Sequence, residues 1–105
     1  MRRVFATAIM MLVLVISAST ANQMLLPMKD GSIRFLVIGD SGTGGGSQRR
    51  VAERIAEVHK QFPFEFSLML GDNLYGGESA GDYRRKFEEP YKPLLDAGVK
   101  FFAAQ

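Results

Sequence analysis

FLVIGD at residues 35–40 and SLMLGD at residues 67–72 are two near-copies of one phrase, a short apolar run that stops at Gly-Asp. The two aspartates, Asp40 and Asp72, lie 32 positions apart, which is the spacing of one strand–helix–strand unit. Short apolar runs that end at a turn signal are typical of strands buried on both faces. The repeat therefore predicts two adjacent parallel strands whose carboxyl ends bring both aspartates to one edge of a sheet.

The rest of the chain extends this alternation of strand and helix. Val51, Ile55 and Val58 recur at helical spacing, and Ser47 and Asp82 are the expected N-caps of two helices. The sequence predicts an α/β fold with a parallel βαβαβ sheet. The expected elements are a strand over residues 33–38, a helix over 48–60, a strand over 66–70, a short helix over 82–87, a helical turn over 94–97 and a strand over 99–103.

The N-terminal 21 residues have the layout of a secretory signal peptide. Two arginines precede an apolar run over residues 4–16, and Ser19-Thr20-Ala21 supplies the small residues of a cleavage site. An uncleaved anchor is the alternative, but the run is shorter than the roughly 20 residues of a spanning helix. We expect a signal peptide over 1–21, a leader over 22–32, the folded domain over 33–105, and a secreted or otherwise exported product that meets a membrane only through its signal.

Charge and composition exclude several classes of function. The sequence has 13 Lys and Arg against 11 Asp and Glu, and the excess lies in the two arginines of the expected signal. The remainder is near neutral, so bulk charge does not indicate nucleic-acid binding. Cysteine is absent, which excludes disulfides and thiolate metal sites. His59 and the basic run at residues 84–86 are expected on solvated helix faces.

The two loops that contain the Gly-Asp repeats carry the candidate metal-binding residues. A hard cation prefers carboxylate oxygens, and a ferric ion also accepts a phenolate, so Asp72 and Tyr75 on one turn are candidate ligands together with Asp40. A pair of metals roughly 3.5–4 Å apart needs a bridging carboxylate, and Asp72 on the inner strand suits that role. The glycine-rich loop at residues 39–47 lacks the Gly-Lys-Ser/Thr of a phosphate-binding P-loop.

These loops resemble the opening of the calcineurin-like metallophosphoesterases, in the branch of the purple acid phosphatases. The resemblance covers about residues 34–105. By this resemblance Asp40 and Tyr75 would bind a ferric ion, and Asp72 would bridge it to a divalent ion (Fe, Zn or Mn), in an enzyme that hydrolyses phosphate esters. The matching segments are Ile38-Gly39-Asp40-Ser41-Gly42, Leu70-Gly71-Asp72-Asn73-Leu74-Tyr75, Phe87-Glu88-Glu89-Pro90-Tyr91 and Val99-Lys100-Phe101-Phe102-Ala103.

The sequence departs from this family in its later motifs. The Gly-Asn-His motif that follows the third strand in the family is not present, and His59, the one histidine, matches no family motif. We therefore expect the chain to be the N-terminal βαβαβ portion of a metallophosphoesterase-type layered sandwich, incomplete in its ligand set and inactive alone.

Two other functions stay open from the sequence. Gly39-Asp40-Ser41 also resembles the start of the GDS-type serine esterases, in which Ser41 would be the nucleophile. That interpretation needs a later Asp-x-x-His, which the sequence lacks, and leaves Tyr75 unexplained. The non-enzymatic alternative is an exported interaction module, because one Gly-Asp after a strand is ordinary turn chemistry.

Overall fold

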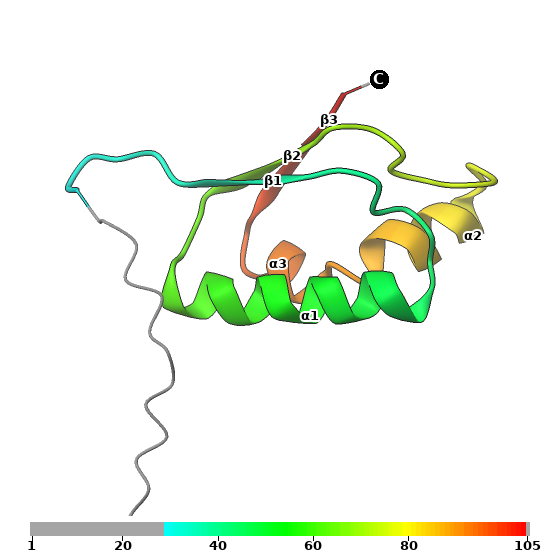
Figure 1. Cartoon of the computed structure of the whole chain (residues 1–105), viewed down its shortest axis with the longest axis horizontal. Helices are drawn as coiled ribbons and strands as arrows, with labels where there is room; N and C mark the ends of the chain where they lie inside the picture. The colour runs from blue at the N-terminus through cyan, green and yellow to red at the C-terminus, as the bar shows by residue number, and fades with distance from the viewer. Residues whose placement is uncertain (1–28, 105) are drawn as a thin grey trace, which may run out of the picture.

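The computed structural model describes residues 29–104 and arranges them as a three-stranded sheet with helices on one face (Figure 1). The expected signal peptide and most of the expected leader lie outside the described residues. Within the described part, no helix is long and apolar enough to cross a membrane. The elements are β1 (Phe35–Ile38), α1 (Gly46–Gln61), β2 (Phe66–Met69), α2 (Ala80–Tyr83), the π-helical turn η1 (Arg84–Glu88), α3 (Lys92–Asp96) and β3 (Lys100–Ala103).

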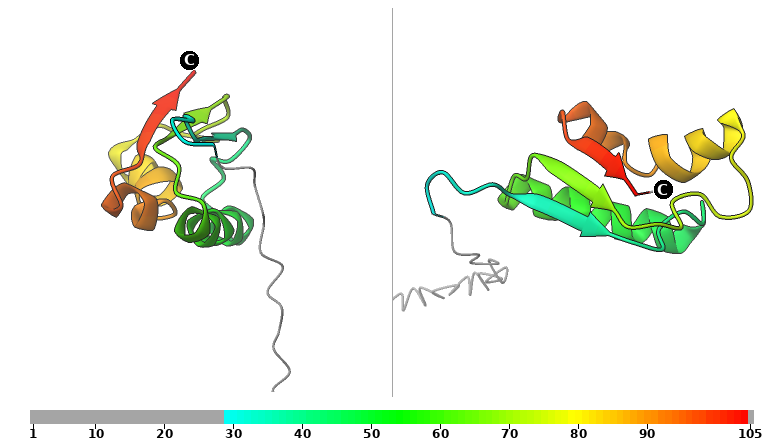
Figure 2. Two further views of the ribbon diagram at one scale, coloured as in Figure 1. Left: turned by 90° about the vertical axis from the view of Figure 1, so that its left-hand side faces the viewer. Right: turned by 90° about the horizontal axis from the view of Figure 1, so that it is seen from above.

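The sheet confirms the predicted parallel topology. Its strand order is β1-β2-β3, and both neighbouring pairs are parallel, as the three arrows of Figure 2 show from above. Phe35 is in register with Phe66, and Phe66 with Lys100. β2 is therefore the central strand, and the loops that follow β1 and β2 leave the sheet side by side at the same edge.

Helix α1 begins two residues before the predicted start, and the prediction that Ser47 caps it is wrong. Its N-cap is Gly45, which makes no side-chain capping bond. Ser47 lies inside the first turn, where its hydroxyl accepts from the Arg50 guanidinium at 3.1 Å. The Gln48 side chain, not Ser47, bonds the loop before the helix, because its amide oxygen accepts from the Gly44 amide at 2.6 Å.

The segment after β2 also starts differently from the prediction. Ser79, not Asp82, is the N-cap of α2, and the two residues form a capping box in which each side chain bonds the other's backbone amide. The helix then widens into η1, where the Glu89 amide donates to the Arg84 carbonyl at 2.9 Å. Lys86 turns inward there and is 4% exposed, so the predicted solvated face over residues 84–86 is wrong at this position.

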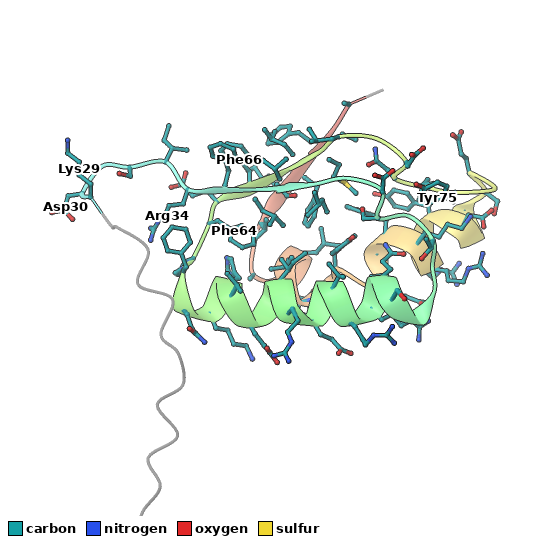
Figure 3. All side chains as sticks on the ribbon, in the orientation of Figure 1. Lys29, Asp30, Arg34, Phe64, Phe66 and Tyr75 are labelled. Carbon is teal, nitrogen blue, oxygen red and sulfur yellow. The ribbon has the colours of Figure 1, made fainter. Side chains whose placement is uncertain are left out.

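Burial is one-sided, which contradicts the expectation that the strands are buried on both faces. All helices lie on the same side of the sheet (Figures 1 and 2), where Phe64 packs while Phe66 lies on the opposite side (Figure 3). On that outer side Phe35, Val37 and Phe102 are about half exposed, and the Phe35 ring stacks on Phe66 at 5.3 Å. The buried apolar core consists of Ala52, Phe64, Met69, Tyr91, Leu94 and Val99.

His59 is not the solvated residue that the sequence predicts. It is partly buried at the end of α1, its Nε2 lies 3.1 Å from the Phe64 carbonyl oxygen, and its ring meets the Phe64 ring edge-on at 4.7 Å. His59 therefore links α1 to the segment that leads into β2, at the end of the helix opposite to the one that follows the first Gly-Asp loop.

Candidate metal site at the ends of two strands

Asp40 lies in the loop that follows β1, and Asp72 lies in the loop that follows β2. Each has a left-handed backbone, with φ of 53° for Asp40 and 52° for Asp72, and these are the non-glycine residues with positive φ in the described part of the chain. Such a conformation costs about 1–3 kcal/mol and is concentrated at functional sites. The repeated Gly-Asp phrase thus encodes a repeated left-handed backbone conformation at its aspartate.

The two loops are joined by backbone hydrogen bonds beyond the ends of the strands. The Asp40 amide donates to the Gly71 carbonyl at 3.2 Å, and the Gly42 amide donates to the Asp72 carbonyl at 3.0 Å. In return, the Tyr75 amide donates to the Gly42 carbonyl at 2.9 Å. A Cβ on Gly42 would lie 2.0 Å from the Asn73 carbonyl oxygen, so this close approach of the loops requires glycine.

Tyr75 reaches across the loops to Asp40. Its hydroxyl donates to Asp40 Oδ1 at 2.9 Å, and both side chains are open to solvent. This hydrogen bond is the largest cause of the lowered pKa of the Asp40 carboxyl, because it favours the charged carboxylate. The same bond, followed by desolvation, raises the pKa of the Tyr75 hydroxyl well above its usual range.

Asp72 belongs to the same cluster. Its carboxyl interacts with both Asp40 and Tyr75, and in each case it adds to the shift in pKa that the Tyr75–Asp40 hydrogen bond dominates. The structure therefore brings together all three residues that the sequence singled out. It does so at the carboxyl edge of the sheet, where parallel α/β proteins bind ligands.

The donors of this cluster suit a hard cation. Two carboxylates and a phenol offer oxygen ligands and no nitrogen or sulfur, which is the preference of Mg²⁺, Ca²⁺ and ferric iron rather than of a softer ion. The described residues contain no group of three or more His, Cys, Asp or Glu side chains that could hold a metal ion. Asp40, Asp72 and Tyr75 together offer two carboxylates and one phenol, which is fewer acidic groups than such a cluster needs.

A hollow of about 710 Å³ opens beside Asp72. Its walls are mixed, because its lining residues include Asp72 and Glu78 as well as the aromatic residues Tyr83, Phe87 and Phe101. Of the three residues of the oxygen cluster, Asp72 lines this hollow, whereas Asp40 and Tyr75 do not.

Lys86 and Gln48 together link the two loops, and the sequence did not predict this role for either residue. Lys86 Nζ donates to the carbonyls of Tyr75 and Gly77, and Gln48 Nε2 donates to the Lys86 carbonyl at 2.6 Å. A signal was present, since Asp82 and Lys86 are four apart on a helix and form an ion pair of 2.9 Å. Sequence alone did not indicate that this lysine is buried.

Ser41 does not have the environment of a nucleophile. Its Oγ is buried and has no hydrogen-bond partner among the described residues. A catalytic serine needs an exposed hydroxyl within reach of a base, and His59 is occupied with the Phe64 carbonyl at the end of α1. The geometry therefore does not favour the serine-esterase alternative.

Comparison with known proteins links the chain to one group of enzymes over part of their length. It is 30% identical over 85 residues to purple acid phosphatase 17 of Arabidopsis thaliana, and 36% identical over 83 residues to purple acid phosphatase 3 of the same plant. These matches cover 79% and 77% of this chain. The chain spans 25% and 23% of the two relatives. No family model and no solved structure matches it.

Proposed function

We propose that this chain supplies the first strands and the first metal ligands of a phosphoric ester hydrolase of the purple-acid-phosphatase type. The observation that carries the proposal is the 2.9 Å contact of Tyr75 with Asp40, which joins the two Gly-Asp loops, with Asp72 beside it. The partial homology to purple acid phosphatases supports the same chemistry at the level of the family. On this proposal the βαβαβ unit is part of a metallophosphoesterase-type sandwich.

Each of the three residues has its own role. Asp40 and Tyr75 would hold a ferric ion, and Asp72, on the central strand, would bridge it to a divalent iron, zinc or manganese ion. Two such cations would neutralise the charge of a phosphate ester and stabilise the charge that develops during its hydrolysis. The protein's contribution is to hold Asp40 and Asp72 in matching left-handed backbones, so that both carboxylates are in place before a cation arrives.

The chain alone is proposed to be inactive and a weak metal binder. Three side-chain ligands among the described residues are fewer than two metal ions need, because each ion takes four or more ligands as a rule. Purified chain with added iron, zinc or manganese should therefore not hydrolyse p-nitrophenyl phosphate. Hydrolysis by a soluble, cooperatively folded monomer would contradict this part of the proposal.

A chimera tests the function directly. The matched segment of this chain is placed in purple acid phosphatase 17 in exchange for the corresponding residues. The chimera should retain phosphate-monoester hydrolysis that chelation abolishes, and Asp72→Asn should lose it. Ser41→Ala is the matched control and should stay active. The esterase alternative would be favoured instead by activity that resists chelation, that a serine-directed phosphonate abolishes, and that Ser41→Ala also loses.

Export of the protein is part of the proposal and rests on residues 1–21. Cleavage after Ala21 would leave Asn22 at the new N-terminus. N-terminal sequencing of the exported product checks this, and a membrane-bound product that keeps Arg2 would support an anchor.

A further inference from the structure

Lys86 is a buried cation with three oxygen partners. Its Nζ donates to the Tyr75 carbonyl and to the Gly77 carbonyl at 3.3 Å, and it pairs with Asp82 Oδ1 at 2.9 Å. An ammonium has three donors and no acceptor, so this environment satisfies it completely. Burying a charge is costly unless the charge is paired and hydrogen-bonded, and all three partners are therefore needed to keep this ammonium in the interior.

The backbone of the same residue reaches the other loop. The Lys86 carbonyl accepts from Gln48 Nε2 at 2.6 Å, and Gln48 Oε1 accepts from the Gly44 amide at 2.6 Å. Gly44 also packs closely on the lysine stem, since a Cβ there would lie 3.1 Å from Lys86 Cγ. Lys86 thus contacts the second Gly-Asp loop with its side chain and the first through Gln48.

We infer that Lys86 is a positioning residue that holds Tyr75 against Asp40, and this inference rests on the proposed function. Tyr75 is held at three points: its amide by Gly42, its hydroxyl by Asp40 and its carbonyl by Lys86. The residue after it, Gly76, has a φ of 75°. Without the ammonium, this glycine junction would leave the Tyr75 carbonyl free to rotate, and the phenol would follow. Lys86 lies in the π-helical turn, a local widening that is frequent at functional sites.

Hydrogen exchange in the full chain tests the positioning role without any metal. Lys86→Met keeps the apolar stem and removes the ammonium. The Tyr75 amide should then exchange about tenfold faster or more, while the Leu70 amide, bonded to the Ile38 carbonyl at 2.8 Å, should keep its rate. Equal acceleration at both amides would show a general stabilising role and overturn the inference, as would no change at Tyr75.

Two further variants serve as a control and as a substitute in this hydrogen-exchange comparison. Lys92→Met removes a surface ammonium that pairs with Asp96 on α3 and should change neither amide. If Lys86→Met does not fold, Lys86→Arg replaces it, because a planar guanidinium cannot copy the three-way contact of an ammonium. It should accelerate the Tyr75 amide and spare the Leu70 amide, and the opposite pattern would overturn the inference.

Binding of Tb³⁺ alone, a hard trivalent probe, connects the role to the metal site. By calorimetry, Lys86→Met should weaken Tb³⁺ binding about tenfold, as loss of a ligand-orienting partner does. In a Tyr75→Phe background the same substitution should have less than about a twofold effect, because the two residues act through one contact. Equal losses in both backgrounds would overturn the inference. A wild-type chain that binds no Tb³⁺ counts against the proposed metal site, and the exchange comparison still decides the role of Lys86.

Discussion

The Tyr75 hydroxyl and the Asp40 carboxylate share one hydrogen bond of 2.9 Å across 35 positions of sequence. The phenol is the donor, so in the metal-free chain Tyr75 keeps its proton and Asp40 keeps its charge. A cation that took both oxygens as ligands would have to displace that proton. On the proposed function, the contact would therefore bring the two ligands together before a metal ion binds, and the metal ion would have to compete with the proton for the Tyr75 oxygen.

Removal of the phenol should be visible in the titration of Asp40. In Tyr75→Phe the pKa of the Asp40 carboxyl should rise toward its ordinary value, because the donor that favours the carboxylate is lost. Carboxyl ¹³C NMR over an acid titration measures this. Tyr83→Phe, in which the lost hydroxyl belongs to a ring packed on Phe87, is the control and should leave Asp40 unchanged. An unshifted Asp40 in Tyr75→Phe would mean that the hydrogen bond does not form in solution.

The close approach of the two loops should make Gly42 intolerant of a side chain. Gly42→Ala places a Cβ against the Asn73 carbonyl, so the loops must separate, and we expect a loss of about 1–3 kcal/mol in the free energy of unfolding. Gly39→Ala is the matched substitution in the same loop, since its Cβ would meet the Leu70 Cβ at an ordinary 3.6 Å. Urea denaturation of both variants checks the difference, and similar losses would refute the steric explanation.

Asp82 should give the fold a specific sensitivity to acid. The Ser79 hydroxyl, and then Lys86, lower the pKa of the Asp82 carboxyl far below its ordinary value of 3.8. The unfolded chain thus takes up the proton at a higher pH than the folded one. The stability that the carboxylate contributes is therefore full above about pH 5 and is lost as the pH falls below 3.8.

Unfolding midpoints measured from pH 6 down to pH 2 test this linkage. Asp82→Asn should be less stable than wild type at pH 6, and the gap should narrow in acid. Asp96→Asn, which removes an exposed pair with Lys92, should follow the wild-type profile. A gap that stays constant from pH 6 to pH 2 would show that the carboxylate charge is not what stabilises the fold.

The outer face of the sheet should make the chain self-associate. Phe102 is 54% exposed on β3 and meets the Phe66 ring at 5.9 Å, which continues the aromatic surface from Phe35. Exposed apolar sheet faces and edges pair with other chains. Phe102→Asp should therefore sediment closer to the monomer than wild type. Val51→Asp adds the same charge on α1, and equal relief by that variant would assign the effect to net charge.

The sequence by itself determined the order of the elements and the edge of the sheet at which Asp40 and Asp72 lie. Two apolar runs that stop at Gly-Asp, spaced by one helix, leave little choice but adjacent parallel strands, because a crossover of that length returns the chain in the same direction. The proximity of Asp40 and Asp72 follows from the same repeat. The helix over residues 48–60 was predictable from its apolar periodicity, since one face must meet the sheet.

Only the tertiary structure decided how these residues meet. Tyr75 contacts Asp40 because Gly42 lets two backbones touch, and that approach depends on atoms more than 30 positions apart in the sequence. The sequence predicts Lys86 to be one of three solvated cations. In the structure the π-helical turn directs it inward, where loop carbonyls accept its hydrogen bonds. Strand burial was mispredicted for the same reason: apolar residues on both faces indicate that a strand can be covered twice, but which face is covered depends on where the helices pack.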